Sequence, residues 1–67
     1  MDTGFKYRNQ EPIYCNDMVR FDDGDIGFVF YNEAMEAWSV KHYDIKTGQA
    51  ALSSLKSVHS FIKEMVI

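Results

Sequence analysis

The sequence predicts a small, mainly β domain (α+β) over residues 1–67, an antiparallel sheet of three to five strands with one amphipathic helix near the C-terminus. Short segments in which apolar and polar residues alternate follow one another up to Tyr43, with turn residues between them. From Leu52 onward the apolar period lengthens to three and four residues. The 67 residues leave no room for two cores, and 46% of them are hydrophobic, which excludes a disordered chain.

Alternation predicts two short strands in the first third of the chain. In Phe5–Arg8 apolar and charged side chains alternate, as in a half-buried strand. The segment Met18–Asp22 alternates again and places Val19 and Phe21 on one face. Turn segments and one short apolar anchor separate the two strands: Asn9–Pro12, Ile13–Tyr14 and Asn16–Asp17.

An Asp23-Gly24 pair predicts a hairpin into the next strand, Ile26–Tyr31. This strand is apolar on both faces, which is typical of a strand in the middle of a curved sheet or beneath a helix. We expect the face with Phe28 to join the core, and Phe28→Ala to cost about 3–5 kcal/mol. Gly27 interrupts the other face, which indicates a bulge or a close backbone approach.

Glu36–Tyr43 is predicted as a third long strand, following the turn Asn32–Met35 and ending at Asp44–Gln49. In this strand Trp38 and Val40 face one way, and Ser39 and Lys41 face the other.

The tail from Leu52 predicts an amphipathic helix, with Thr47 or Ser53 as its N-cap. Its last segment, Glu64–Ile67, fits either a final helical turn or a closing strand. Strands followed by a helix give an SH3-like, partly open antiparallel barrel. Its expected core comprises apolar residues from every element: Val19, Phe21, Ile26, Phe28, Phe30, Trp38, Val40, Leu52, Leu55, Val58 and Ile62.

The run Gln10–Gly24 resembles the C-terminal module of YopX-like phage and prophage proteins. That family carries a pattern of the type G-K-x-I-Y-E-G-D-I-V before its hairpin strands. Cys15-Asn16 replaces the family's Glu-Gly. Four residues keep the spacing of the pattern: Ile13, Tyr14, Asp17 and Val19.

Later segments resemble the same family. Gly27–Val29 is similar to its G-x-V strand, Ala51–Leu55 to its Leu/Ser segment, and Glu64–Ile67 to its E-V-I strand. The resemblance implies a compact β-rich domain from a phage or mobile element. It supplies no catalytic residue, and it favours a closing strand at Glu64–Ile67.

The residue types that carry most catalytic and metal chemistry are scattered. Cys15, His42 and His59 have no metal-ligand spacing, and the four glycines form no phosphate-binding loop. No nucleophile motif frames a serine. We therefore expect no enzyme activity, no metal site and no cofactor.

The segment Asp17–Glu36 holds six acidic residues and one basic residue, Arg20. Such acids can simply keep turns solvated and strand edges from aggregating, and this interpretation stays open beside a functional one. The functional one is an acidic and aromatic hairpin surface that binds a partner, with these candidate residues: Asp22, Asp23, Asp25, Tyr31, Glu33, Glu36 and Tyr43.

The leading hypothesis is a small non-enzymatic phage or mobile-element protein that binds, and by binding inhibits, a host nucleic-acid-handling or defence protein. One alternative is a nucleic-acid-binding SH3-like module that uses Lys41, Tyr43 and Lys46, although a net charge of −3 disfavours it. Another is a structural or assembly protein that self-associates, for instance as a homodimer.

The expected location is the cytoplasm, that of the host if a phage encodes the chain. Its single cysteine fits a reducing compartment, and its first residues do not read as a signal peptide. The apolar runs are too short to cross a membrane.

Overall fold

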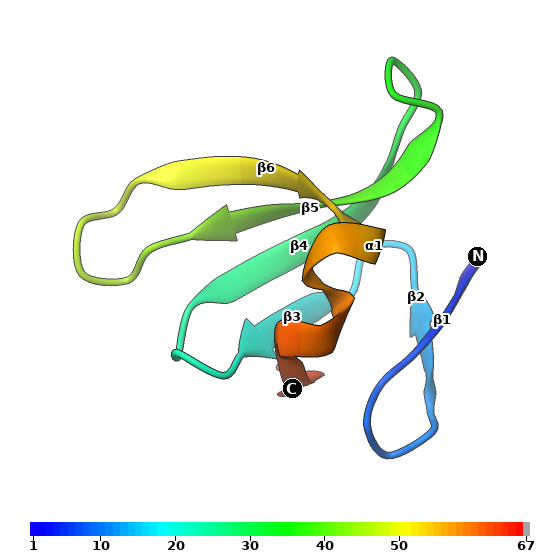
Figure 1. Ribbon diagram of the computed structural model, residues 1–67, viewed down its shortest axis with the longest axis horizontal. Helices are drawn as coiled ribbons and strands as arrows, with labels where there is room; N and C mark the ends of the chain where they lie inside the picture. The colour runs from blue at the N-terminus through cyan, green and yellow to red at the C-terminus, as the bar shows by residue number, and fades with distance from the viewer. Residues whose placement is uncertain (67) are drawn as a thin grey trace.

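The computed structural model describes residues 1–66 and shows a mainly β chain built from two antiparallel sheets (Figure 1). A two-stranded sheet pairs β1 with β2, and a five-stranded sheet has the order β6-β5-β4-β3-β7. The elements in chain order are β1 (Asp2–Lys6), β2 (Pro12–Tyr14), β3 (Met18–Phe21), β4 (Ile26–Asn32), β5 (Ala37–Tyr43), β6 (Ala50–Ser54), α1 (Leu55–Val58), the 3-10 turn η1 (His59–Phe61) and β7 (Ile62–Met65).

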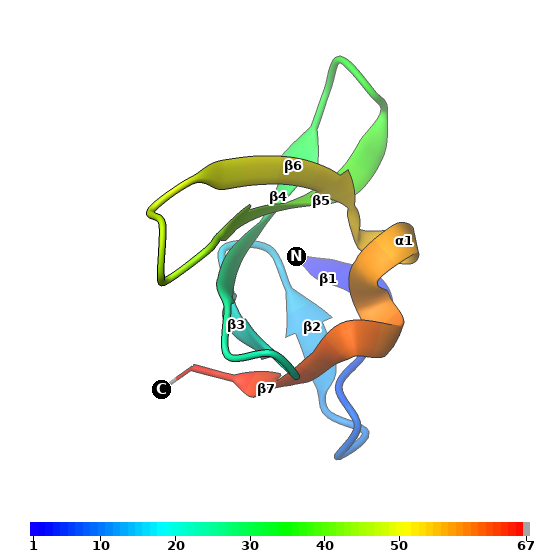
Figure 2. The ribbon, with the colours of Figure 1, turned by 60° about the vertical axis from the view of Figure 1, so that its left-hand side comes forward.

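The large sheet curves around β1 without closing into a complete barrel (Figure 2). Helix α1 and η1 carry the chain from β6 at one edge of the sheet to β7 at the other. The mainly β, partly open antiparallel arrangement expected from the sequence is therefore confirmed. The closing-strand interpretation of the tail is also right for Glu64 and Met65, which pair with β3. Ile67 lies outside the described residues.

The hairpin at Asp23-Gly24 forms as predicted between β3 and β4. The Phe21 N–H donates to the Asp25 carbonyl at 2.8 Å, and the Gly24 N–H donates to the Phe21 carbonyl at 3.0 Å. Gly24 adopts a φ of 92°, which a residue with a Cβ reaches only with strain. Turn chemistry in the sequence thus locates this hairpin.

Strand β4 lies in the middle of the sheet, as its two apolar faces predict, but the expected core face is wrong. Val29 is fully buried, whereas Phe28 is only half-buried on the outer face. Gly27 explains the choice: a Cβ there would lie 2.6 Å from Val40 Cγ1 and 2.9 Å from Phe21 Cε2. The missing side chain lets Phe21 and Val40 pack on this face, so the close-approach interpretation of Gly27 is confirmed.

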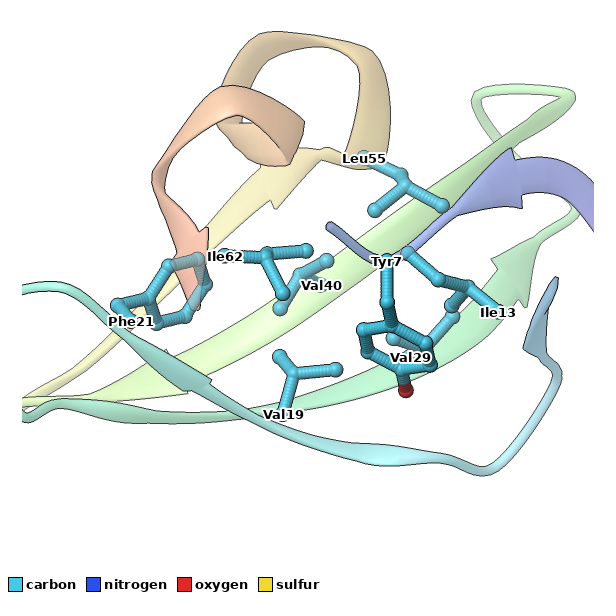
Figure 3. Packing of buried hydrophobic residues seen from close by; sticks show 8 residues of the cluster. All are labelled: Tyr7, Ile13, Val19, Phe21, Val29, Val40, Leu55 and Ile62. Carbon is cyan, nitrogen blue, oxygen red and sulfur yellow. The ribbon is translucent and has the colours of Figure 1, made fainter. Parts of the chain in front are cut away.

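The core joins both sheets and the tail (Figure 3). Trp38 and Val58, expected inside, are partly buried against this cluster, and Ile26 and Phe30 lie half-buried on the outer face with Phe28. The buried apolar side chains are Tyr7, Ile13, Val19, Phe21, Val29, Val40, Leu55 and Ile62.

The long helix predicted from Leu52 is wrong. Residues 50–54 instead pair with β5, with Leu52 opposite Lys41, and Leu52 is 51% exposed. The N-cap is Ser54, whose Oγ accepts from the Ser57 N–H at 3.2 Å. Only one helical turn and one 3-10 turn follow, and they suffice to bring both Leu55 and Ile62 into the core. Backbone pairing with β5 outweighs the helical period at the start of this segment.

The N-terminal segment also differs from expectation. Strand β1 ends at Lys6 rather than Arg8, and the predicted apolar anchor Ile13–Tyr14 belongs to its partner strand, β2. The ring of Tyr7, just after β1, enters the core, and its hydroxyl donates to Asp17 Oδ2 at 2.9 Å. Burial and this hydrogen bond raise the pKa of the Tyr7 hydroxyl. The small hairpin is therefore an integral part of the core.

Candidate functional site

The seven candidate residues fall at the two opposite ends of β4. The three aspartates occupy the β3–β4 turn, and Tyr43 lies at the same end of the sheet, opposite Ile26. Tyr31, Glu33 and Glu36 lie at the other end, around the β4–β5 turn. Seven residues of β4 at about 3.3 Å each separate the two ends by about 20 Å. The structure thus places these residues at two separate turns, about one strand length apart.

Asp22 is engaged within the chain. Arg8 donates to both of its carboxylate oxygens, at 2.8 and 2.7 Å, and also to the Ser60 carbonyl at 3.0 Å. The hydrogen bonds from Arg8 hold the pKa of the Asp22 carboxyl below its usual value and raise the pKa of the guanidinium. A charge count over Asp17–Glu36 misses Arg8, so the acidic surface is less negative than the sequence predicts.

The other two aspartates of the turn differ in their hydrogen bonding. Asp23 Oδ1 accepts from the Asp25 N–H at 2.9 Å, so this carboxylate helps to hold the turn. Within residues 1–66 no hydrogen bond reaches the carboxylate of Asp25, which is half-buried. Within residues 1–66, Asp25 is thus the carboxylate of the turn with neither oxygen engaged, whereas Asp23 uses one of its two.

An acidic groove runs along this turn. Its first hollow, about 240 Å³, has apolar walls from the core edge and from η1, and its second, about 340 Å³, continues between the β3–β4 and β5–β6 turns. Phe61 and Ile45 flank it and are 58% and 63% exposed. We define the acidic groove by the residues that line the two hollows: Phe21, Asp22, Asp23, Gly24, Asp25, His42, Asp44, Ile45, Lys46, Val58 and Phe61.

His42 closes the inner wall of the groove. Its ring packs edge-on against Phe21 with centroids 5.7 Å apart, and its Nε2 lies 3.0 Å from Ser53 Oγ. Because β5 alternates, its neighbours Lys41 and Tyr43 lie on the outer face of the sheet, with the Lys41 ammonium 5.9 Å from the Tyr43 ring centroid. Tyr43 is therefore near the acidic turn but outside the groove.

The three residues of the nucleic-acid alternative are not brought together as a basic surface. Lys41 and Tyr43 share the outer face, whereas Lys46 lines the groove beside Asp23, Asp25 and Asp44. The carboxylates around Lys46 would repel a phosphate group.

The second tip is built differently. Tyr31, 45% exposed, packs edge-on against Trp38 with centroids 5.2 Å apart. The Glu36 N–H donates to the Glu33 carbonyl at 3.2 Å, and Glu36 has a φ of 52°. These contacts fix the turn, and Glu33 and Glu36 are both exposed.

Sequence reasoning missed four contributors to the acidic groove: Phe61, Ile45, Asp44 and His42. Phe61 carried a usable signal, because it is a large aromatic residue that the predicted core of the tail leaves out. Ile45 is likewise a lone aliphatic residue within a turn segment. Nothing local to either residue points to Asp22, since the β3–β4 turn is distant in sequence.

Over residues 1–66, no three His, Cys, Asp or Glu side chains gather as metal ligands would. No helix in that part of the chain is long and apolar enough to cross a membrane. Comparison of the chain with protein-family models, with curated proteins and with solved structures finds no match.

Proposed function

We propose that this chain is a non-enzymatic binding protein whose acidic groove takes a basic segment of a partner protein. The observation that carries the proposal is the pairing, in one hollow, of the apolar walls of Phe21 and Phe61 with the Asp25 carboxylate. A lysine or arginine side chain has the matching form, since its stem is apolar and its head is charged.

The contact between Arg8 and Asp22 supports this match. It is a two-fold guanidinium–carboxylate hydrogen bond formed at the rim of the groove, the geometry in which arginine is recognised most specifically. Asp25 offers a second carboxylate in the same turn. The exposed Phe61 and Ile45 would add apolar area removed from water when a partner binds.

The proposed partner class is a host protein that handles nucleic acid or takes part in defence. The likeness to YopX-like proteins supports an origin in a phage or mobile element. Proteins that bind nucleic acid present lysine and arginine to phosphates, so an acidic groove complements their working surface. Stoichiometric binding there would inhibit the partner without any reaction.

A titration with defined peptides tests the groove. The probe is a short peptide with arginine between apolar residues, and its control replaces arginine by glutamate. We expect the arginine peptide to shift the amide resonances of Phe21, His42 and Val58, and Asp25→Lys to weaken its binding at least about ten-fold. Glu33→Lys makes the same charge change at the other tip and should leave binding near the wild-type value.

If Asp25→Lys and Glu33→Lys weaken peptide binding equally, the acidic residues serve only solubility, and the proposal is overturned. Salt-sensitive retention of the wild type on immobilised DNA or RNA, lost in Lys41→Glu, would replace it by the nucleic-acid alternative. Asp22→Lys is unsuitable as a test, because it would place a second cation in contact with the Arg8 guanidinium.

A further inference from the structure

Strand β6 is an edge strand with backbone groups that face outward. The Asp44 N–H donates to the Gln49 carbonyl at 2.9 Å, and the register between β5 and β6 continues from there without a shift. Hydrogen-bonded and non-hydrogen-bonded pairs alternate along an antiparallel ladder. Ala51 and Ser53 therefore bond to β5, whereas the N–H and C=O groups of Ala50 and Leu52 point away from it.

The hydrogen bonds between β4 and the β3 side lead to the same conclusion about which backbone groups of β6 face outward. Val29 exchanges hydrogen bonds with the β3 side, donating to the Asp17 carbonyl at 2.9 Å and accepting from the Asn16 N–H at 2.8 Å. Its β5 partner, Val40, must then bond to Ser53 on β6. Among residues 1–66 no other strand pairs with β6, and Figures 1 and 2 both show it as the outer edge of the sheet.

The edge of β6 lacks the devices that keep edge strands apart. Residues 50–54 contain no charge and no proline, and their register shows no bulge. The opposite edge, β7, carries Lys63 and Glu64. An uncharged, regular edge pairs readily with another strand.

We infer that β6 pairs antiparallel with β6 of a second copy of this chain, around a two-fold axis at Leu52. In this register Leu52 lies opposite Leu52 of the other copy, and Ala50 lies opposite Ser54. Like residues meet at a two-fold axis, and here none of them is charged. The two five-stranded sheets join into one continuous sheet.

The outer face favours edge pairing over stacking of two sheets. Register places Met18, Phe28, Lys41 and Leu52 in one row across it, with Leu52 at the edge. Edge pairing extends the apolar part of this row from one copy to the next. It leaves the two Lys41 side chains three strand spacings apart, about 14 Å, beyond the screening length of about 8 Å. Stacking would press both lysines into an apolar contact.

The pairing is independent of the proposed function, because no residue of the acidic groove belongs to β6. A peptide that binds the groove should therefore bind Ala50→Pro as well as it binds the wild type.

Sedimentation velocity of the whole chain, from about 10 µM to about 1 mM, tests the pairing. We expect the 7.8 kDa chain to approach twice that mass at the highest concentration. Ala50→Pro removes an N–H that makes no bond within residues 1–66, a substitution that edge strands tolerate. It should weaken association at least about ten-fold. Ala50→Thr keeps the N–H and should associate like the wild type.

Amide hydrogen exchange of the wild type provides a measurement that does not depend on how the proline variant folds. Exchange at Ala50 and Leu52 should slow as protein concentration rises, while exchange at the exposed Lys46 amide should not change. A wild type that stays monomeric at about 1 mM, or concentration-independent exchange at Ala50 and Leu52, overturns the inference. Association of folded Ala50→Pro at wild-type strength would do the same.

Discussion

Leu52 and Leu55 are three residues apart, and their side chains meet opposite environments. Leu52 lies on the outer face of β6 and is 51% exposed, whereas Leu55 is fully buried among the core residues. The change of direction occurs at Ser54, where the strand ends and the side chain caps α1. Burial rather than residue type decides what each leucine contributes to stability.

Leu55→Ala should lower the free energy of unfolding by about 2–5 kcal/mol, because it leaves a cavity in a closed core. Leu52→Ala should change it by less than about 1 kcal/mol. Urea denaturation at low micromolar concentration measures both without interference from association. Equal losses in the free energy of unfolding would instead support the long amphipathic helix with Leu52 in the core.

On β4, the position of Phe28 likewise determines how much its side chain contributes to stability. A cost of about 3–5 kcal/mol for Phe28→Ala assumes full burial, but the side chain is half-buried on the outer face. Its truncation should cost less than that of Leu55.

At the scale of elements, Arg8 joins three segments that are distant in sequence. It follows β1, forms an ion pair with Asp22 in the β3–β4 turn, and donates to the Ser60 carbonyl in η1. Both partners of the ion pair are about half-exposed, at 54% and 47%, so salt screens the contact. The ion pair therefore helps to hold the groove wall in place more than it stabilises the whole fold.

The pH dependence of this contact has a defined sign. Asp22 has a lowered pKa in the folded chain, so its contribution is present above the unfolded value of about 3.9 and is lost as the pH falls through the folded value. Arg8→Gln should lower the Tm at pH 7, and its difference from the wild type should shrink below about pH 4.

Thermal unfolding between pH 7 and pH 2 measures this difference. Lys56→Gln is the matched control, since Lys56 forms no ion pair within residues 1–66 and its effect should not follow the Asp22 titration. A difference for Arg8→Gln that persists at pH 2 would mean that the hydrogen bond to Ser60 accounts for it.

At the scale of the whole molecule, the N-terminal hairpin completes the core of the open sheet. Tyr7 and Ile13 are buried beside side chains from β3, β4 and β5. Residues 16–67 alone would expose this apolar surface, which a domain of about 60 residues or fewer can hardly tolerate.

A chain that starts at Asn16 should therefore fail to fold at 25 °C, as judged by the loss of amide dispersion and of near-ultraviolet circular dichroism. The control variant keeps residues 1–15 and carries Glu33→Lys and Glu36→Lys in the β4–β5 tip, where both side chains are exposed. It should remain folded. A dispersed spectrum from residues 16–67 would contradict an integral hairpin.

The sequence by itself determined the features that depend on neighbouring residues. Asp23-Gly24 located the β3–β4 hairpin, because a turn with positive φ requires such residues. The two apolar faces of Ile26–Tyr31 placed that strand in the middle of the sheet, and alternation correctly assigned Val19, Phe21 and Val40 to the core. At the acidic groove it identified the three aspartates, since charge and turn signals are local.

Only the tertiary structure decided which of two apolar faces of β4 turns inward, since an alternating pattern that is apolar on both sides carries no preference. Phe21 and Val40 pack against Gly27 in the space that a side chain would occupy, and this packing turns the face with Val29 inward. Pairing with β5 likewise made residues 50–54 a strand although their period fits a helix. The ion pair of Arg8 and the position of Phe61 beside the aspartates arise the same way, from contacts between segments far apart in the chain, which no local pattern encodes.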